Sequence, residues 1–278
     1  MNYQKTSICK LCKGKTNYLF SLEIAQSINA DYYECEVCKT LQSYHLDDMS
    51  SNELKNFYES TDSLGLDNGA AWRQYCIVNR LQTLVRLKLI RSFSLEGFKV
   101  LDFGAGSGFV SSSLKFKLGW DVYTYEPYIK PYFSTVKFLK NIDEVIANKP
   151  YNLIIESEVF EHLNKPADTL NMMRDILHKD WFYVFVTTGL YIPGKRDKSW
   201  AYLAPMTGQH TTFYSTESMK KVGEILGSSR IYQIGAEYEW LFAKYPSKMP
   251  LLHDITNIFS LKFLQMQVKW GFLPKIEE

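Results

Sequence analysis

An acidic residue followed by three alternate glycines is the feature of this sequence with the clearest chemical meaning. The run begins at Asp102, ends at Gly108, and directly follows a short apolar segment. Glycines allow a tight turn and let a ligand approach the backbone closely. The segment Trp120–Glu126 reads as a second strand and ends in a carboxylate about 20 residues beyond the glycines, where an acid can hold the two hydroxyls of a ribose. The pattern predicts a strand, a turn and a helix that bind a nucleoside.

The acid before the glycines limits the kinds of ligand that the turn can bind. The dinucleotide fingerprint places a pyrophosphate at the helix N-terminus, and a carboxylate such as Asp102 beside it would repel that group. A ligand with a cationic amino-acid end suits this position. The alternative is a generic Rossmann-like turn without a ligand.

The acid-x-Gly-x-Gly-x-Gly run from Asp102 to Gly108 resembles the first motif of class I S-adenosylmethionine methyltransferases. The resemblance implies a glycine loop under the methionine part of the cofactor, Asp102 near its amino group and Glu126 on its ribose. The expected cofactor is therefore S-adenosylmethionine. The candidate cofactor-binding residues are Asp102, Gly104, Ala105, Gly106, Gly108, Glu126, Pro127 and Glu156.

A second chemical signal lies at the end of the expected strand Asn152–Ile155. Glu158, Glu161 and His162 follow it and resemble the Glu-x-x-Glu-His signature of many small-molecule methyltransferases. In a helix these residues would share one face. That face could hold a divalent ion or place a substrate hydroxyl beside a base. Alternatively, the acids satisfy backbone donors and His162 is structural. We favour this second interpretation over a metal, and substrate contact stays open.

The third signal is His210, which follows a long loop over residues 188–209 that contains Trp200 and Tyr202. Loops of this length in a compact domain are usually functional. In the resembled family, a histidine before an aromatic-Ser/Thr helix start often faces the acceptor. Histidine can take a proton from a sugar hydroxyl or an activated carbon near neutral pH. A backbone-bonded turn histidine is the alternative. The candidate catalytic residues are His210, as the first choice of base, and Glu158, Glu161 and His162.

Four of the five cysteines form two Cys-x-x-Cys pairs near the N-terminus: Cys9 with Cys12, and Cys35 with Cys38. Two residues between paired thiols let both sulfurs face one ion, and two such pairs complete a tetrahedron. The sequence predicts a structural zinc ribbon with these four ligands. Disulfides or unrelated thiols are the alternatives, and disulfides are disfavoured in a reducing compartment. Cys76 lies in a helical pattern and reads as a core thiol.

The ribbon and the segment Cys35–Tyr58 resemble the N-terminal part of bacterial sugar methyltransferases. The zinc-containing deoxysugar C-methyltransferases among them are longer, with a further C-terminal domain. The resemblance therefore implies a small-molecule acceptor, with a hydroxyl of a sugar or glycan-biosynthesis intermediate favoured over a keto-sugar carbon. Two alternatives stay open. One is an RNA base methyltransferase with the ribbon as RNA-binding module, and the other is a non-catalytic cofactor-binding or scaffold protein.

Composition limits the partners. The chain has 278 residues and a formal net charge of +2, which gives no global reason to expect nucleic acid. The N-terminal residues lack the apolar core of a signal peptide, and no apolar run has the length of a membrane span. We expect a cytoplasmic protein. The apolar segment Met249–Trp270 suits docking on its own domain or a homodimer contact.

Alternating strand and helix patterns predict an α/β fold with a doubly wound sheet. The resemblance to class I methyltransferases implies that this is a seven-stranded Rossmann-like methyltransferase sheet, accompanied by the small N-terminal zinc ribbon. Pro166 starts a helix, and Ser215 caps another that ends before Gly227. Expected domains are a zinc ribbon (1–45), a helical linker and cofactor lid (46–92), the methyltransferase domain (93–246) and a helical appendage (247–278).

Overall fold

The computed structural model describes residues 7–61, 69–92, 97–128, 132–133, 136–235, 238–246 and 251–269. The chain forms two compact units, each built from several segments. The ribbon unit comprises Met1–Asp67, Glu158–Met172 and Thr188–Leu226, and the sheet unit comprises Asn68–Ser157, Met173–Thr187 and Gly227–Glu278. The predicted domain boundaries remain a prediction, because this division follows packing and not chain order. Parts of the expected linker and appendage, residues 62–68, 247–250 and 270–278, lie outside the described residues.

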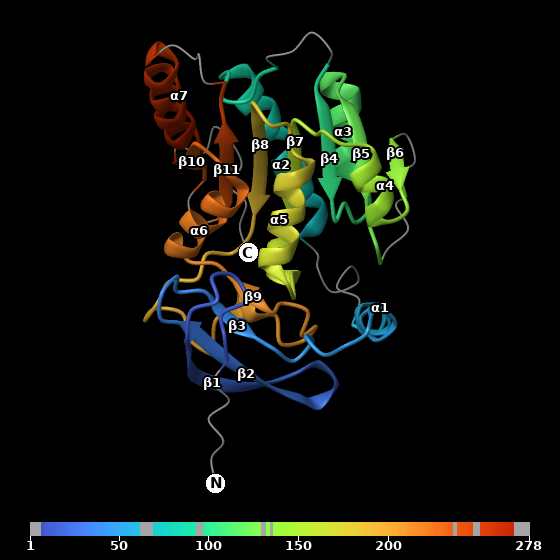
Figure 1. Cartoon of the computed structure of the whole chain (residues 1–278), viewed down its shortest axis with the longest axis vertical. Coiled ribbons are helices and arrows are strands. Elements are labelled where there is room, and N and C mark those ends of the chain that lie inside the picture. The colour runs from blue at the N-terminus through green and yellow to red at the C-terminus, as the bar shows by residue number, and fades with distance from the viewer. Residues whose placement is uncertain are drawn as a thin grey trace. The chain divides into compact units, whose positions relative to one another are not determined.

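The sheet unit contains the predicted seven-stranded sheet, in the order β10-β11-β8-β7-β4-β5-β6 (Figure 1). Its five central and right-hand strands, from β8 to β6, run parallel, and β10 and β11 add an antiparallel pair at the other edge. The strands are β4 (Lys99–Phe103), β5 (Asp121–Tyr125), β6 (Lys137–Leu139), β7 (Leu153–Ser157), β8 (Phe182–Thr187), β10 (Arg230–Gln233) and β11 (Glu239–Lys244).

The centre of this sheet is apolar because it is covered on both faces. Leu153, Ile154 and Ile155 of β7 are fully buried between β4 and β8, as their continuous apolar run predicts. Helices α2 (Ala70–Arg86), α3 (Phe109–Leu118) and α4 (Ile142–Ala147) belong to the same unit. Helix α2 buries Ile77, Leu81 and Leu84 at helical spacing in the core that α3 and the sheet share.

Helix α7 (Leu251–Lys269) packs on the sheet unit, beside β10 in Figure 1. Leu264 is fully buried in the core of that unit, and Ser260 donates a hydrogen bond to the carbonyl of Leu87. This apolar segment was expected to dock on its own domain or on a second copy of the chain, and Leu264 packs it on its own unit. Phe259 and Phe263 of the same helix are exposed.

The ribbon unit has its own four-stranded antiparallel sheet, in the order β1-β2-β3-β9. Strands β1 (Thr16–Ile24) and β2 (Ile28–Cys35) form an antiparallel hairpin, joined through the short helix η1 (Ala25–Ser27). The short strands β3 (Leu41–Ser43) and β9 (Thr212–Phe213) were not predicted. Strand β9 joins the ribbon to a segment far along the chain.

Two helices of the ribbon unit begin at side-chain caps, of which Ser215 was predicted and Ser50 was not. Helix α1 (Ser51–Ser60) starts with a capping box between Ser50 and Glu53, and α6 (Thr216–Leu226) follows Ser215, whose hydroxyl accepts from the N–H of Ser218 at 3.1 Å. Two single turns, η2 (Phe160–His162) and η3 (Ala201–Leu203), belong to the same unit. Helix α5 (Pro166–Ile176) begins at Pro166 as predicted, and the chain passes from one unit to the other within it.

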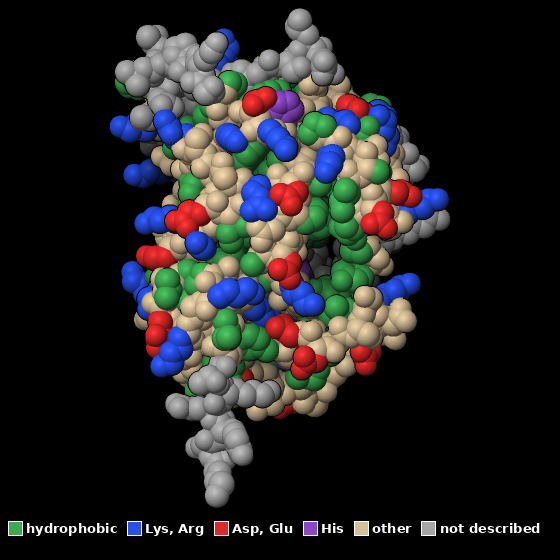
Figure 2. Space-filling view, viewed as in Figure 1, with side chains coloured by type: hydrophobic (Ala, Val, Ile, Leu, Met, Phe, Trp, Pro, Cys, Tyr) green, Lys and Arg blue, Asp and Glu red, His purple; other side chains and the backbone are tan. Residues whose placement is uncertain are grey.

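No helix among the described residues is long and apolar enough to cross a membrane. On the face shown in Figure 2, Lys and Arg side chains alternate with Asp and Glu. This mixture fits the small net charge of the chain.

Candidate functional site

The glycine-rich turn of the sheet unit joins β4 to α3. Gly104, Gly106 and Gly108 have φ of 71°, 52° and 77°, a region that favours glycine. A Cβ built on Gly106 would meet no atom within 4 Å, so the turn has open space above it. Ala105 is buried beside it. A ligand can therefore approach this backbone, as the motif requires.

The carboxylate of Glu126, directly after β5, faces the same turn. One oxygen accepts a hydrogen bond from the N–H of Gly106 and the other from the N–H of Tyr128, both at 2.8 Å. These two bonds fix the orientation of the carboxylate beside the turn. The arrangement fits a residue that receives ribose hydroxyls. Pro127 is exposed next to it.

Asp102 lies in β4 and is almost completely buried. Its carboxylate accepts a very short hydrogen bond from the hydroxyl of Ser111 in α3. Burial raises the pKa of Asp102 to about 6, partly opposed by the bond from Ser111. The side chain thus ties the strand to the helix on either side of the glycine turn. Glu156 is likewise fully buried, in β7.

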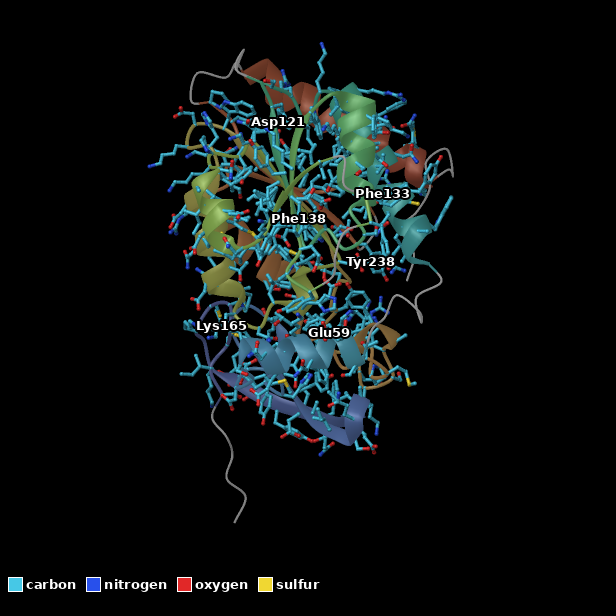
Figure 3. All side chains as sticks on the ribbon, turned by 90° about the vertical axis from the view of Figure 1, so that its right-hand side faces the viewer. Glu59, Asp121, Phe133, Phe138, Lys165 and Tyr238 are labelled. Carbon is cyan, nitrogen blue, oxygen red and sulfur yellow. The ribbon has the colours of Figure 1, made fainter. Side chains whose placement is uncertain are left out.

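The start of α2 lies against the same turn. The Ser107 hydroxyl donates to the side chain of Gln74 at 3.3 Å. Trp72 and Tyr75, on the same turn of α2, stack on each other and are half-exposed. The N–H of Phe133, a residue labelled in Figure 3, donates to the carbonyl of Ser107. These aromatic side chains suit the expected cofactor lid, which stays a prediction.

A second group of polar side chains gathers in the ribbon unit around Glu161, which is fully buried in η2. The hydroxyl of Tyr202 donates to one carboxylate oxygen and the hydroxyl of Thr188 to the other, both at 2.8 Å. Burial raises the pKa of Tyr202 well above its usual range, and the carboxylates of Glu158 and Glu161 raise it further. Glu161 is therefore held by two hydroxyl donors inside the unit.

Glu158 does not lie on a helix. Its backbone has a φ of 54°, which is uncommon for a residue with a side chain, and only Phe160–His162 form a single 3-10 turn. The helical face that would present Glu158, Glu161 and His162 together is therefore absent from these described residues. The positive φ lets Glu158 approach the Tyr202 hydroxyl instead, at 3.2 Å. Glu158 is half-buried, whereas Glu161 is enclosed.

His210 and His162 lie edge to face, with ring centroids 4.7 Å apart. The Nδ1 of His210 is 2.7 Å from the main-chain oxygen of Tyr202, and a carbonyl only accepts hydrogen bonds. Nδ1 therefore carries a proton, and in the neutral form of the ring the lone pair lies on Nε2. Burial lowers the pKa of His162 well below its usual range, with His210 contributing. The hydroxyl of Tyr58 lies 3.4 Å from Nδ1 of His162.

The ribbon holds the backbone around His210. His45 bonds to the carbonyl of Gly208 at 2.8 Å, and the N–H of Ser43 donates to the carbonyl of Thr211. The side chain of Gln209 donates to Thr61 at the end of α1. Residues on both sides of His210 are thus fixed by segments of the first 61 residues.

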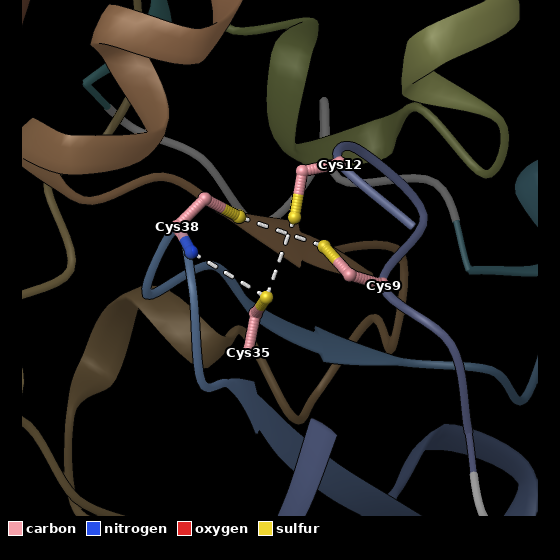
Figure 4. Close-up of side chains that lie close together, drawn as sticks. All are labelled: Cys9, Cys12, Cys35 and Cys38. Carbon is pink, nitrogen blue, oxygen red and sulfur yellow. Dashed lines mark hydrogen bonds between the residues drawn. The ribbon is translucent and has the colours of Figure 1, made fainter. Parts of the chain in front are cut away.

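The four ribbon cysteines converge on one point (Figure 4). The Sγ atoms of Cys9 and Cys38 are 3.6 Å apart, and those of Cys12 and Cys35 are 3.5 Å apart. The N–H groups of Val37 and Cys38 point at the sulfur of Cys35. Four sulfurs with backbone donors on one of them fit a tetrahedral zinc ion. Cys76 lies apart, in the core of the sheet unit.

Glu161, His162 and His210 are the second group with metal-binding side chains, and one ligand atom from each lies within 4.8 Å of the others. Glu158 is not a member of this group, so the ion-binding set considered from the sequence differs from the one that the structure assembles. The structure brings all four candidate catalytic residues into one cluster. Sequence reasoning gave no role to Tyr202, Thr188 or Tyr58, because their positions follow no motif or spacing.

A family model described as a methyltransferase domain matches residues 72–227, more than half of the chain. The chain belongs to this methyltransferase family. The prediction of a class I S-adenosylmethionine-dependent methyltransferase is thereby confirmed at the level of the family, and the seven-stranded sheet agrees with it. No curated protein sequence matches the chain.

Several solved structures resemble the chain at low identity. CalO1, a methyltransferase in calicheamicin biosynthesis solved with SAH bound, is 11% identical over 61% of this chain and 54% of its own, with a TM-score of 0.40. An O-methyltransferase-type protein from Nostoc punctiforme PCC 73102 is 13% identical over 68% of each chain, with a TM-score of 0.44. An O-methyltransferase family protein from Burkholderia thailandensis is 8% identical over 69% and 64%, with a TM-score of 0.45. The chain spans about half of the first of these structures.

Proposed function

We propose that this protein transfers the methyl group of S-adenosylmethionine to a hydroxyl of a sugar or a glycan-biosynthesis intermediate, with His210 as the general base. When bound, the cofactor supplies an electrophilic methyl group on a good leaving group. Positioning of the acceptor and removal of its proton are then the tasks of the protein.

The hydrogen bond of the His210 ring to the main chain is the observation that carries this proposal. The hydrogen bond from Nδ1 to the carbonyl of Tyr202 leaves Nε2 unprotonated in the neutral ring. A hydroxyl acceptor needs such a base as its oxygen forms the new bond, because the proton must leave during the transfer. His162, kept neutral by burial, adds no competing positive charge beside it.

The residues of the sheet unit fit the cofactor. The open space above Gly106 suits a close ligand, and the oriented carboxylate of Glu126 would accept hydrogen bonds from the ribose hydroxyls. Asp102, enclosed between β4 and α3, would hold the turn in shape and favour the cationic methionine end. Ala105, Gly104, Gly108, Pro127 and Glu156 complete the proposed set.

A sugar-type acceptor is favoured by a polar side chain close to the base. Sugars present several hydroxyls that can donate hydrogen bonds. The half-buried carboxylate of Glu158, which contacts Tyr202 beside His210, could accept one of them. The mixed surface charge in Figure 2 gives no support to an RNA acceptor.

We further propose one structural zinc ion per chain, held by Cys9, Cys12, Cys35 and Cys38. The zinc would fix the ribbon, whose strand β3 pairs with β9 and whose knuckle carbonyl at Cys38 accepts from the hydroxyl of Ser215 at 3.0 Å. Reduced thiols are required, so a cytoplasmic location is part of this proposal.

The proposal is tested with His210→Ala and a panel of sugar nucleotides and free glycans, by methyl release and calorimetric titration of the cofactor. Turnover should fall by about 10²–10⁴-fold, while cofactor affinity stays unchanged. A rise in the acceptor KM alone would make His210 a positioning residue. Unchanged turnover and unchanged acceptor KM would show that His210 is not the base.

A further inference from the structure

We infer that Tyr202 is the positioning residue of the acceptor side, because its hydroxyl contacts the carboxylates of Glu161 and Glu158 and its main-chain carbonyl bonds to His210. The inference rests on the role proposed above for His210. It adds a residue that no motif in the sequence singles out.

The hydroxyl of Tyr202 lies between two carboxylates. It is 2.8 Å from an oxygen of Glu161 and 3.2 Å from an oxygen of Glu158, with the shorter bond to the fully buried residue. Thr188 donates to the other oxygen of Glu161. A buried carboxylate that loses one donor keeps a desolvated lone pair. The two hydroxyls therefore fix Glu161, and the Tyr202 hydroxyl also contacts Glu158, whose backbone has a positive φ.

The carbonyl of Tyr202 has a separate effect. It accepts a hydrogen bond from Nδ1–H of His210, with 2.7 Å between nitrogen and oxygen. This bond selects the tautomer in which Nε2 is the base. The ring of Tyr202 also packs against the imidazole, with centroids 4.8 Å apart. Any displacement of Tyr202 would consequently move the carboxylates and the base together.

Gly189 leaves the space for this ring. A Cβ at Gly189 would lie 2.5 Å from Cδ1 and Cε1 of Tyr202, closer than real side-chain contacts. Trp200 packs against the same ring, with ring centroids 5.4 Å apart. The ring is therefore enclosed between the backbone of Gly189, Trp200 and His210. This restricts the positions of the Tyr202 hydroxyl and of its main-chain carbonyl oxygen.

The hydroxyl is tested by Tyr202→Phe against Tyr191→Phe. Tyr191 is a matched control, because it lies in the same hydrophobic cluster and its hydroxyl also donates to a carboxylate, that of Glu34, at 2.8 Å. Tyr202→Phe should lower kcat by about 10- to 100-fold with the acceptor KM within about twofold, as expected for misplaced groups. Tyr191→Phe should leave both unchanged. Thr188→Val, which removes the other donor to Glu161, should act like Tyr202→Phe and serves if that variant does not fold.

The carbonyl is tested without any acceptor or cofactor. Long-range ¹H–¹⁵N spectra of the histidine rings at alkaline pH distinguish the two neutral tautomers, and His210→Ala identifies the signal. His210 should carry its proton on Nδ1 in the wild-type protein and in Tyr202→Phe, which keeps the carbonyl. In Gly189→Ala, which displaces the ring, the signal should change to a mixture of tautomers.

Two results would overturn the inference. One is a proton on Nε2 of His210 in the wild-type protein, and the other is a kcat for Tyr202→Phe and Thr188→Val equal to that of Tyr191→Phe. Failure of every sugar acceptor would instead contradict the proposed function, and the tautomer measurement would still decide the role of the Tyr202 carbonyl.

Discussion

At the scale of single residues, the molecule separates two kinds of acid that look alike in the sequence. Asp102 and Glu161 are enclosed and bonded to hydroxyl groups, whereas Glu126 is bonded to main-chain donors and Glu158 is half-buried. Glu126 and Glu158 are therefore better placed to touch a ligand. The enclosed pair fix the backbone and side chains around them.

Replacing Glu126 by alanine should weaken binding of S-adenosylmethionine by about 1–3 kcal/mol, the scale of a lost hydrogen bond to a charged group. That corresponds to roughly a 5- to 150-fold rise in Kd. Titration calorimetry measures it. Glu144→Ala is the control, because Glu144 also accepts a main-chain N–H, from Lys140 at 2.9 Å, but belongs to α4. Equal affinities of the two variants would contradict the ribose contact.

Asp102 predicts a pH dependence of stability. Its pKa is about 6 in the folded protein against 3.8 for the ordinary group, so folding favours the protonated form. The corresponding stability is present below about pH 4 and is lost as the pH rises through about 6. Asp102→Asn does not lose this stability, because an amide does not titrate. Between about pH 5 and pH 8, its free energy of unfolding should gain about 1–2 kcal/mol relative to the wild-type protein. Urea unfolding at both pH values checks this, and a constant difference would refute it.

At the scale of elements, the sequence predicts what long apolar patterns and caps determine. The strand after Lys99, the helix after Pro166 and the helix between Ser215 and Gly227 are found as expected. Strands β3 and β9 have only three and two residues, too few for a periodic signal, and pair across a great distance in the chain. The backbone at Glu158 takes its positive φ from its surroundings, which no local pattern reveals.

The zinc site gives a prediction for the ribbon. Cys35→Ser should reduce the zinc content from one ion per chain to none and lower the melting temperature, because metal binding and folding of such small sites are coupled. Metal analysis and calorimetry measure both quantities. Cys76→Ser is the control, since Cys76 is buried elsewhere and its replacement should leave zinc bound. Retained zinc and unchanged melting in Cys35→Ser would exclude the site.

At the scale of the whole molecule, two discontinuous units divide the two proposed tasks between them. The candidate cofactor residues belong to the sheet unit, and all four candidate catalytic residues belong to the ribbon unit. The chain changes unit between Ser157 and Glu158, directly after a strand of the large sheet. The sequence analysis names both groups and places both in the expected domain 93–246. The packing of the second group with the ribbon joins segments far apart in the chain, which no local sequence pattern reveals.

Helix α7 stabilises the molecule through Leu264. Leu264→Ala should lower the free energy of unfolding by about 2–5 kcal/mol, as for other buried leucines. Phe263→Ala, at a side chain that is 46% exposed, should change it by no more than about 0.5 kcal/mol. Sedimentation of the same two variants tests the predicted homodimer. If α7 forms the contact, Phe263→Ala should shift the measured mass from that of a dimer toward that of a monomer. Equal stability of the two variants would contradict the packing of α7.

The pairing of β3 with β9 has a consequence for the exchange of parts between related enzymes. Four segments meet there: the zinc knuckles, the end of α1, the turn at Glu161 and the loop before α6. A chimera that takes its ribbon from one parent and its loop around His210 from another would combine two segments whose side chains do not fit each other. The ribbon and this loop must therefore be exchanged together. A natural change of acceptor among related enzymes would then leave correlated substitutions in the residues packed around β3 and in those packed around β9.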